Sequence, residues 1–351
     1  MKYVMLKDVC SIIMGQSPAS DSYNDNGEGI PFFQGNADFG ERYPVTRKWC
    51  SKPIKIAAPE DILISVRAPI GAMNYAKEEC CIGRGLAALT PNKTKVSSNF
   101  IFWLLKWKNV ELNSKGTGST FKAIGRKVLE EMIVPDISLE KQIEYSKVLE
   151  IVYKTIQFRK EELRKLDILI KARFVEMFGD PVLNPLRWDV KPVIDICDCM
   201  VPGRDKPKSF TGAIPWITID DLIVNSTTFR SKQGQGLTEA EISEVKRKTI
   251  PVGSVMMSCV GNLGICSIAG NEMIINQQLH SFQCHSEINN VFLMYYLGQR
   301  KDYMEKQASS TTVLYMNKSV CNSIPVIIPD LELQEQFASF VNQVDKSKVV
   351  A

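Results

Sequence analysis

The chain has 351 residues, of which 44% are hydrophobic and 23% charged, and its formal net charge is +4. These proportions are typical of folded globular proteins and exclude a disordered or fibrous class. Because the net charge is small, it does not by itself identify a surface that binds a polyanion.

The length predicts two or three domains, each able to bury its own core. No stretch reaches the roughly 18 apolar residues of a membrane-spanning helix, and the N-terminus lacks the pattern of a secretion signal. We therefore expect a cytoplasmic protein. The ten cysteines are scattered without a Cys-x-x-Cys pair, which favours reduced, mostly buried thiols over disulfides or a metal site.

The first predicted domain covers residues 1–138. Its short apolar runs, such as DILISV from Asp61, are rich in β-branched residues and bounded by Pro and Gly. Such runs predict buried strands that end in turns, and the domain as a whole is expected to be mixed α/β.

A long helix is predicted for residues 139–179, because no Pro or Gly occurs between Pro135 and Gly179. About forty residues at 1.5 Å each give a length of roughly 60 Å. Apolar residues recur along it at intervals of seven, which favours a coiled-coil seam, although a helix in an ordinary core would show the same stripe. The residues that we expect to pack against a partner helix are Leu149, Val152, Ile156, Leu163, Leu166, Ile170 and Met177.

The segment FGDPVLNPLRW, from Phe178, is rich in Gly, Pro and Asn and marks the connection to the second predicted domain, residues 180–330. That domain contains the strand-like run SVMMSCV. Beyond it, Leu333, Phe337 and Val344 recur at helical spacing. They predict the start of a second, shortened helix over residues 331–351.

The two domains repeat each other at a spacing near 193 residues, which indicates a duplicated domain rather than a solenoid. The run PEDILISVRAPIGAMNYA corresponds to PVGSVMMSCVGNLGICSIAG, pairing Ser65 with Ser258 and Gly71 with Gly264. The run CIGRGLAAL corresponds to IINQQLHSF. Order and spacing are preserved, so the sequence predicts a single fold that occurs twice.

Two further pairs of segments extend the repeat towards the helices. NFIFWLL corresponds to NVFLMYY, with Asn99 opposite Asn290. IVPDISLEKQ corresponds to IIPDLELQEQ, with Gln142 opposite Gln336. Each repeat is therefore expected to close with the entry into a helix.

Two α/β domains, each ending in a PD-x-x-LxxQ entry into a helix and joined by FGDPxxNPxxW, form a recognisable pattern. Over essentially the whole chain it resembles the specificity subunits of type I restriction-modification systems. The resemblance lies in the order and duplication of the motifs more than in any single one.

The resemblance implies two target recognition domains related by a pseudo-twofold repeat, with their long helices packed as an antiparallel coiled coil. Each domain would recognise one half of a bipartite double-stranded DNA target. It also implies no cofactor on this chain. Methylation and cleavage would belong to separate modification and restriction subunits, which bring S-adenosylmethionine, ATP and magnesium.

One departure concerns the second helix, which in the family is about as long as the first. Here some twenty residues follow Asp330. An apolar stripe left without its mate predicts weak solubility, self-association through that stripe, or a complementing partner chain.

Recognition of DNA requires donors and acceptors that reach base edges and cations that contact phosphates. Loops rich in such residues occur in both repeats. The candidate DNA-binding residues are Gln16, Ser17, Gln34, Asn36, Arg67, Arg84, Ser119, Lys122, Arg204, Lys206, Lys208, Thr218, Asp220, Asn262, Gln277, Ser310 and Thr312.

Arg67 and Arg84 lie at strand ends where the second repeat has Val260 and Gln277. Arg favours guanine and Gln favours adenine, so the two domains are expected to recognise different half-sites. Either side chain could instead form a structural ion pair or a core hydrogen bond. The Ser/Thr clusters before each PD motif have a shared role or simply form turns.

The basic runs could neutralise phosphates or could be solvated surface. They are Arg47-Lys48, Arg126-Lys127, Lys206 with Lys208, and Lys246-Arg247-Lys248. His280, Cys284 and His285 form the single metal-like grouping, and it lacks a fourth ligand at zinc spacing. We interpret it as a buried thiol beside surface imidazoles.

Two other functions compete with DNA recognition. One is a fragment of a fused restriction enzyme with its own activity, yet the carboxylate–lysine fragments are short and no phosphate-binding loop of the G-x-x-x-x-G-K-[ST] type occurs. We therefore expect no catalytic residues. The other is a helical scaffold for partners, for which DNA contact would be incidental.

Overall fold

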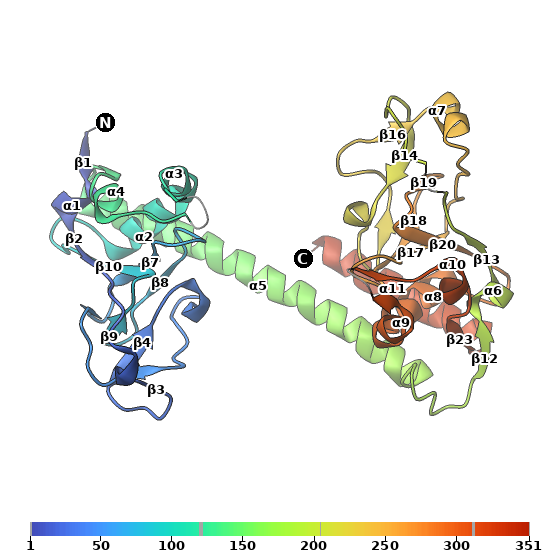
Figure 1. Ribbon diagram of the computed structural model, residues 1–351, viewed down its shortest axis with the longest axis horizontal. Helices are drawn as coiled ribbons and strands as arrows, with labels where there is room; N and C mark the ends of the chain where they lie inside the picture. Colours follow the sequence, from blue (N-terminus) through green and yellow to red (C-terminus); the bar gives the residue numbers. More distant parts are fainter. Residues whose placement is uncertain (1, 119–121, 204, 311–312, 351) are drawn as a thin grey trace. The chain divides into compact units, whose positions relative to one another are not determined.

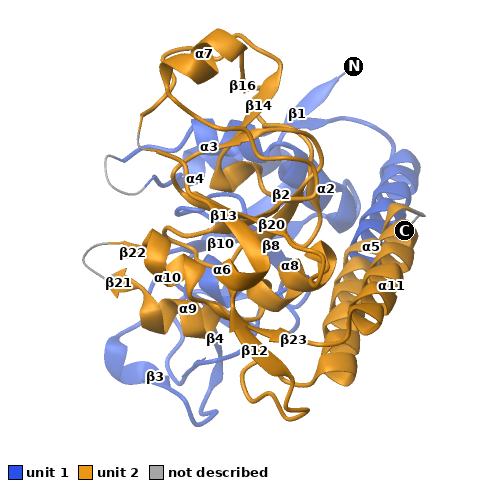
Figure 2. Cartoon of the chain, turned by 90° about the vertical axis from the view of Figure 1, so that its right-hand side faces the viewer, with its two compact units in different colours: residues 1–158 blue, residues 159–351 orange. Residues whose placement is uncertain are grey.

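The computed structural model describes residues 2–118, 122–203, 205–310 and 313–350. The chain forms two compact units, residues 1–158 and 159–351, and the boundary falls inside the long helix α5 (Leu139–Phe178), as Figures 1 and 2 show. Each unit has its own hydrophobic core. No helix within the described ranges is long and apolar enough to cross a membrane.

Unit 1 contains short strands and helices before α5. Its elements are β1 (Tyr3–Met5), α1 (Leu6–Val9), β2 (Cys10–Met14), β3 (Tyr23–Asn24), β4 (Ile30–Phe33), β5 (Trp49–Cys50), β6 (Ile56–Ala57), β7 (Ile62–Ser65), β8 (Met73–Tyr75), β9 (Cys80–Ile82), β10 (Leu86–Pro91), α2 (Ser98–Trp107), α3 (Asn109–Ser114), α4 (Arg126–Glu130) and β11 (Ile133–Pro135).

These strands form an antiparallel sheet in the order β2-β10-β7-β8 and a mixed sheet in the order β3-β5-β4-β9-β6. Strand β7 explains why Ile62, Leu63 and Ile64 are consecutive apolar residues. Ile62 and Ile64 face the core that contains α2, whereas Leu63 faces the core that contains β9. Because successive side chains of a strand point to opposite faces, a strand buried on both faces carries no polar alternation.

Unit 2 contains the same kinds of element. They are β12 (Asp189–Pro192), α6 (Val193–Ile196), β13 (Cys197–Met200), β14 (Ile214–Ile217), β15 (Thr227–Thr228), β16 (Gly236–Leu237), α7 (Glu239–Glu244), β17 (Val255–Ser258), β18 (Cys266–Ala269), β19 (Ile274–Ile275), β20 (Leu279–Cys284), α8 (Asn290–Gly298), α9 (Lys301–Gln307), β21 (Ser309–Ser310), β22 (Leu314–Tyr315), α10 (Lys318–Asn322), β23 (Pro325–Ile328) and α11 (Leu331–Val350).

The strand pairing of unit 2 repeats that of unit 1. Its larger sheet has the order β13-β20-β17-β18-β15, and Leu279 lies opposite Ser258 as Leu86 lies opposite Ser65. The parallel pair β14–β19 corresponds to the parallel pair β4–β9. The predicted mixed α/β fold and its internal repeat are therefore confirmed.

Two glutamines fasten the long helices to their domains in the same way. The side-chain oxygen of Gln142 accepts a hydrogen bond from the backbone N–H of Ser97 (2.9 Å), and that of Gln334 accepts one from Asn289 (2.9 Å). Each glutamine also donates to the backbone just before its helix. Gln334, rather than the exposed Gln336, is thus the counterpart of Gln142.

This correction has a simple cause. The strands that lead into the helices place Pro135 opposite Ile327, so the two PD pairs do not occupy equivalent positions, and an alignment on PD displaces the glutamines by two residues. The same bonds pair Ser97 with Asn289, which shifts the α2–α8 alignment by one residue. Asn99 therefore corresponds to Val291 and not to Asn290.

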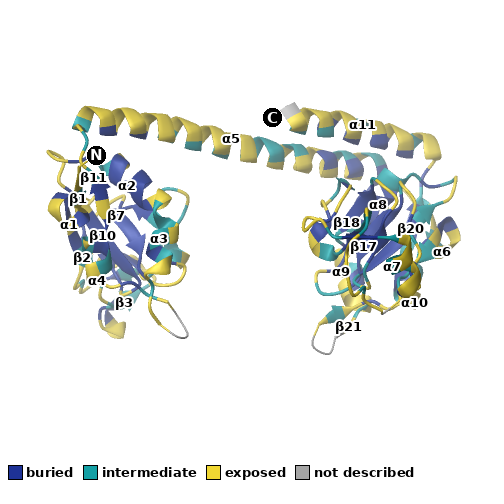
Figure 3. Ribbon diagram, turned by 90° about the horizontal axis from the view of Figure 1, so that it is seen from above, coloured by how far each residue is buried: buried dark blue, intermediate teal, exposed yellow. Residues whose placement is uncertain are grey.

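Helix α5 is mostly exposed along its first half, and one face of it becomes buried along its second half (Figure 3). Leu149, Val152 and Ile156 are 44–49% exposed. Leu163, Leu166 and Met177 are half-buried, and Ile170 is fully buried. The seven residues predicted to pack against a partner helix therefore fall into an exposed and a covered group.

Helix α11 covers the second half of α5 and runs antiparallel to it. The Phe337 ring near the start of α11 lies 5.3 Å from that of Phe174, while Lys348 near its end forms an ion pair with Asp167 (2.8 Å). Later residues of α11 therefore contact earlier residues of α5, which means that the two helices are antiparallel. The short second helix is thus a mate for half of the apolar stripe.

Candidate nucleic-acid interface

Five chain segments of unit 1 meet at one edge of its sheets through backbone hydrogen bonds. Gln16 donates to Ile82 (3.0 Å), and Gly85 donates to Gln34 (3.1 Å). Val66 donates to Gly85 (2.9 Å), and Ala68 to Lys122 (3.1 Å). We call this edge 1, and its polar side chains are Gln16, Gln34, Arg67, Arg84 and Lys122. All five are exposed.

Glycines are needed where these segments cross. A Cβ atom on Gly85 would lie 2.3 Å from the carbonyl oxygen of Gln34, and one on Gly15 would lie 2.1 Å from that of Gly83. Both contacts are with backbone and would force the segments apart. The glycines beside Gln16 and Arg84 therefore allow the close approach of the loops.

Unit 2 builds the corresponding edge with the counterparts of the bonds from Val66 and Ala68 and of a further unit 1 bond, from Gly83 to Phe33 (2.8 Å). The backbone N–H of Asn276 donates to Ile217 (2.9 Å), that of Cys259 donates to Gln278 (2.9 Å), and that of Gly261 donates to Leu314 (2.8 Å). We call this edge 2, and its residues are Thr218, Val260, Asn262, Gln277 and the β21–β22 hairpin. Both edges thus share a backbone framework.

The side chains on the shared framework differ between the units. Arg67 forms a backbone bridge with Ala123, and Val260 forms one with Tyr315. Arg84 and Gln277 both lie exposed in the turn that enters the next long strand. Within the described ranges, no carboxylate forms an ion pair with Arg67 or Arg84. Their guanidinium groups are therefore open to a ligand.

Several other candidates are already engaged within the protein. Thr218 donates from its hydroxyl to Asp221 (2.8 Å) in a capping interaction, and Asn262 accepts from Lys301 (2.8 Å). Lys208 forms an ion pair with Glu244. Ser17 and Asn36 are half-buried beside edge 1, whereas Asp220 and Lys206 are exposed. These contacts reduce the number of candidates that are free to bind DNA.

Some candidate DNA-binding residues are not among those that the structure describes. Ser119, Arg204 and Thr312 are not among the described residues, and of Ser310 the backbone alone is described, as part of β21. The described residues at these segments pair in equivalent ways. Thr117 pairs with Ala123 in unit 1, and Ser309 pairs with Tyr315 in unit 2.

Arg42 is a residue of this region that the sequence did not single out. Its guanidinium lies 4.9 Å from the ring centres of both Tyr75 and Phe102 and forms an ion pair with Glu150 of α5 (2.9 Å). The loop that follows Asn36 is thereby fastened to the helix. Nothing in the local sequence around Arg42 indicates this contact, because its partners are 33 to 108 residues away.

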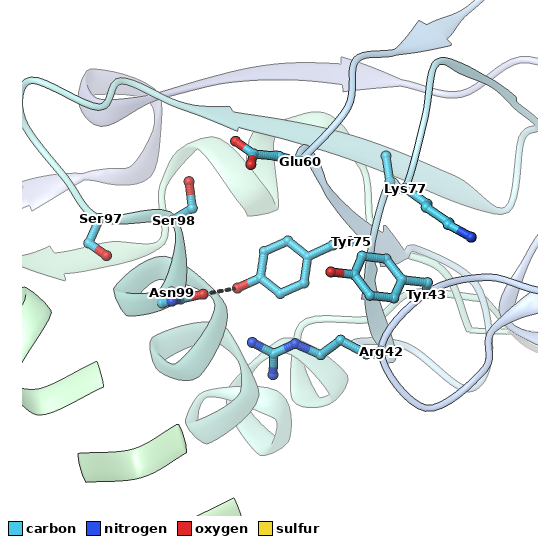
Figure 4. A pocket seen from close by; sticks show the side chains of 9 residues that line it. Arg42, Tyr43, Glu60, Tyr75, Lys77, Ser97, Ser98 and Asn99 are labelled. Atoms are coloured by element: carbon cyan, nitrogen blue, oxygen red, sulfur yellow. Dashed lines mark hydrogen bonds between the residues drawn. The ribbon is translucent and has the colours of Figure 1, made fainter. Parts of the chain in front are cut away.

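Arg42 also lines a pocket of about 520 Å³, shown in Figure 4. Tyr43, Tyr75 and Asn99 lie around it, and the Tyr75 hydroxyl donates to Asn99 (2.9 Å). Burial raises the pKa of Tyr75, so its hydroxyl remains a neutral donor. The start of α2 forms part of the pocket wall.

The histidine and cysteine grouping of unit 2 differs from its prediction. His280 is 1% exposed rather than on the surface, and its Nε2 lies 3.1 Å from the side-chain oxygen of Asn322. Burial lowers the pKa of His280 to about 4. His285 is exposed and lies beside Asp198. In the described part of the chain, no three His, Cys, Asp or Glu side chains gather where they could hold a metal ion.

The cysteines agree with their prediction. All ten are free thiols, and all are buried except Cys199 and Cys284, which are half-buried. Burial raises the pKa of the thiols of Cys10 and Cys80 to about 12, so these groups remain protonated. They act as small apolar side chains of the core.

A comparison with protein families gives two matches along the chain. The type I restriction modification DNA specificity domain matches residues 1–167 and again residues 185–349. A solved structure of the S subunit of a type I restriction-modification system from M. genitalium has a TM-score of 0.61 and 12% sequence identity, covering 99% of this chain and 90% of that one. This likeness concerns the fold.

Curated relatives match part of the chain. The specificity subunit of type I restriction enzyme MjaX from Methanocaldococcus jannaschii is 45% identical over 156 residues, or 44% of this chain and 37% of that protein. The specificity subunit of type I restriction enzyme HindI from Haemophilus influenzae is 26% identical over 155 residues, or 42% of this chain and 33% of that protein. The matched region thus spans less than half the length of either relative.

Proposed function

Because this chain belongs to the family of type I restriction-modification DNA specificity proteins, we propose that it recognises a bipartite target in double-stranded DNA. Edge 1 recognises one half of the target and edge 2 the other. The chain determines which DNA site is recognised, and separate subunits perform methylation and cleavage.

The observation that carries this proposal is a common backbone framework with different polar side chains. Base edges in the major groove are distinguished by their pattern of donors and acceptors. Exposed Arg84 can offer a two-donor fork to guanine, whereas Gln277 at the same place can pair with adenine. A pair of similar but unequal surfaces suits a target with two different halves.

The division of work between subunits is supported by the names of the relatives, which are subunits of restriction enzymes. We propose that modification subunits bring S-adenosylmethionine and that a restriction subunit brings ATP and magnesium. The exposed first half of α5 offers an apolar surface to such partners.

Selection from a pool of random duplexes tests the DNA proposal. The full chain is immobilised, bound duplexes are recovered at 150 mM salt, and the enriched sequences are determined. We expect two short motifs separated by a fixed gap. Recovery of one compact motif, or of no motif, would contradict the proposal.

A second experiment tests the absence of catalysis. The purified chain is incubated with its selected target and magnesium, with and without a methyl donor. We expect neither cleavage nor methyl transfer. Turnover by the chain alone would favour a fused enzyme.

A further inference from the structure

A basic pocket of about 300 Å³ opens in unit 2 beside the end of β13. Lys246, Arg247 and Lys248 line it from the loop after α7, and Lys318 lines it from α10. The chain from Met200 to Gly203 forms its other wall. Three lysines and an arginine around one hollow create a local positive potential that the overall charge of +4 does not reveal.

Arg247 is the informative member, because it is only 7% exposed and its hydrogen bonding is incomplete. One terminal nitrogen donates to the carbonyl of Asp205 (2.5 Å), and the guanidinium lies 5.4 Å from the ring centre of Trp216. Its Nε and other terminal nitrogen have no acceptor among the residues that the structure describes. Buried donors without partners are costly, so an anion that reached them from the pocket would be stabilised by them.

The charges around the pocket favour an anion. Burial lowers the pKa of Arg247, and Asp205 opposes this shift. Lys246, Lys248 and Lys318 are exposed, and none forms an ion pair with a residue in the described ranges. The neighbouring carboxylate of Asp198 lies beside His285. The pocket thus keeps an excess of positive charge.

The position of the pocket connects it to edge 2. Trp216, whose ring contacts the Arg247 guanidinium, belongs to β14. Strand β14 ends at Ile217, next to Thr218, and its parallel neighbour β19 runs into the turn of Gln277. A DNA strand whose bases face edge 2 would carry its phosphates past such a pocket.

We propose that this pocket holds one backbone phosphate of the DNA strand that edge 2 recognises, an inference that rests on the proposed function. Arg247 donates two hydrogen bonds to the phosphate oxygens, and the three lysines add charge. Phosphate contacts fix the register of a protein on DNA without reading sequence. The pocket is therefore a positioning site for the second domain.

Unit 1 has an apolar residue where unit 2 has Arg247. Ile250 bridges Met273 in unit 2, as Ala57 pairs with Cys80 in unit 1, and this register places Ile54 where unit 2 has Arg247. Ile54 is apolar and 50% exposed. The two domains consequently differ in how they hold the DNA backbone as well as in their edges.

The test compares binding of the selected duplex across a series of potassium chloride concentrations. The variant K246Q/K248Q/K318Q removes exposed charges, so its fold should be retained. We expect the slope of log K against log salt to decrease in magnitude by about 1, because the lysine charge that helps to neutralise one phosphate is removed. Target and unrelated duplexes should weaken by the same factor, leaving the specificity ratio unchanged.

Two further variants sharpen the result. K160Q/K165Q/K171Q removes three exposed lysines of α5 and should leave the slope unchanged. Arg247→Lys keeps the charge but not the fork, and should weaken binding of target and unrelated duplexes equally, with thermal unfolding used to verify its fold. An unchanged slope in the pocket variant, or an equal decrease in the control, overturns the inference.

The outcomes distinguish a failure of the phosphate site from a failure of the proposed function. If the wild-type chain discriminates a bipartite target while the pocket variant keeps its slope, the phosphate site alone is refuted. If the wild-type chain prefers no bipartite target, the proposed function itself fails. Titration with inorganic phosphate forms the last arm. If Arg247→Lys abolishes the binding of inorganic phosphate without changing the binding of DNA, the pocket is a site for a free anion. That result would overturn the DNA assignment.

Discussion

Arg84 and Gln277 hold the same place in the two repeats, in exposed turns between equivalent strands. Their backbone positions are set by bonds from Gly85 to Gln34 and from Asn276 to Ile217. Neither side chain takes part in those bonds. A substitution at either position should therefore change what the protein recognises while leaving its fold intact.

We predict that Arg84→Ala relaxes specificity at one position of one half-site and costs about 1–3 kcal/mol of discrimination there. Gln277→Ala should do the same in the other half-site. Repeating the duplex selection and measuring competition between single-base variants provides the readout. Lys141→Ala, an exposed charge on α5, is the matched control and should leave both motifs unchanged.

If Arg84→Ala weakens all duplexes equally, Arg84 contacts a phosphate and not a base. If it changes neither affinity nor motif, edge 1 is not the recognition surface.

His280 predicts a pH dependence of stability. Burial holds the pKa of the folded state near 4, below the ordinary value of 6.5, so the unfolded chain takes up a proton that the folded chain does not. This contribution is fully present above pH 6.5 and is lost as the pH falls towards 4. Its size is up to about 3 kcal/mol. Chemical denaturation at half-unit pH intervals measures it.

His280→Gln should flatten stability between pH 6.5 and 4. The chain has one other histidine, and His285→Gln supplies the control because that side chain is exposed beside Asp198. Equal pH profiles for wild type and His280→Gln would show that His280 does not titrate as its burial implies.

At the scale of elements, the two glutamines attach each helix to its domain. Gln142→Ala should leave the half-buried N–H of Ser97 without an acceptor and cost about 1 kcal/mol in unit 1. Gln334→Ala should do the same in unit 2 through Asn289. Amide hydrogen exchange resolved by segment should report faster exchange in α2 or α8 respectively.

Gln336→Ala is the matched control, since Gln336 is exposed and lies two residues from Gln334. Its exchange pattern should equal that of the wild type. Protection lost in α8 for Gln336→Ala but kept for Gln334→Ala would restore the alignment that the sequence alone predicts.

The sequence predicts elements where local pattern determines structure. The apolar run of β7 and the uninterrupted stretch of α5 are such cases. It fails for the register of Gln142, because the two PD pairs look equivalent in sequence but are two residues apart in the strand pairing. It also fails where partners are distant in sequence, as for Arg42 and Glu150. The sequence also does not show which candidate side chains already form hydrogen bonds within the protein. Thr218 is one, because its use in a cap depends on a turn that pattern does not specify.

At the scale of the molecule, the first half of α5 presents an apolar surface that no described side chain covers. Val148, Leu149, Ile151, Val152 and Ile156 are 44–65% exposed. Contiguous apolar surface of this kind marks a site of interaction between proteins. Helix α11 provides the precedent, because it covers the second half of the same helix through Phe337.

We predict that the isolated chain associates with itself through this surface and that L149Q/V152Q/I156Q abolishes the association. Sedimentation velocity over a range of concentrations measures it. The control V110Q/V182Q/L183Q removes apolar side chains elsewhere that are even more exposed, at 63–82%. A wild-type chain that stays monomeric at all concentrations, or a control that also dissociates, would contradict the prediction.

The framework shared by edges 1 and 2 has a consequence for how such proteins change over time. Backbone hydrogen bonds and glycines hold the loops in place. The outward-facing side chains can therefore be substituted without loss of the fold. Under the proposed function, one half of the DNA target can therefore change while the other half stays the same. Single substitutions on one edge would then give new target sequences, and each such variant would still fold.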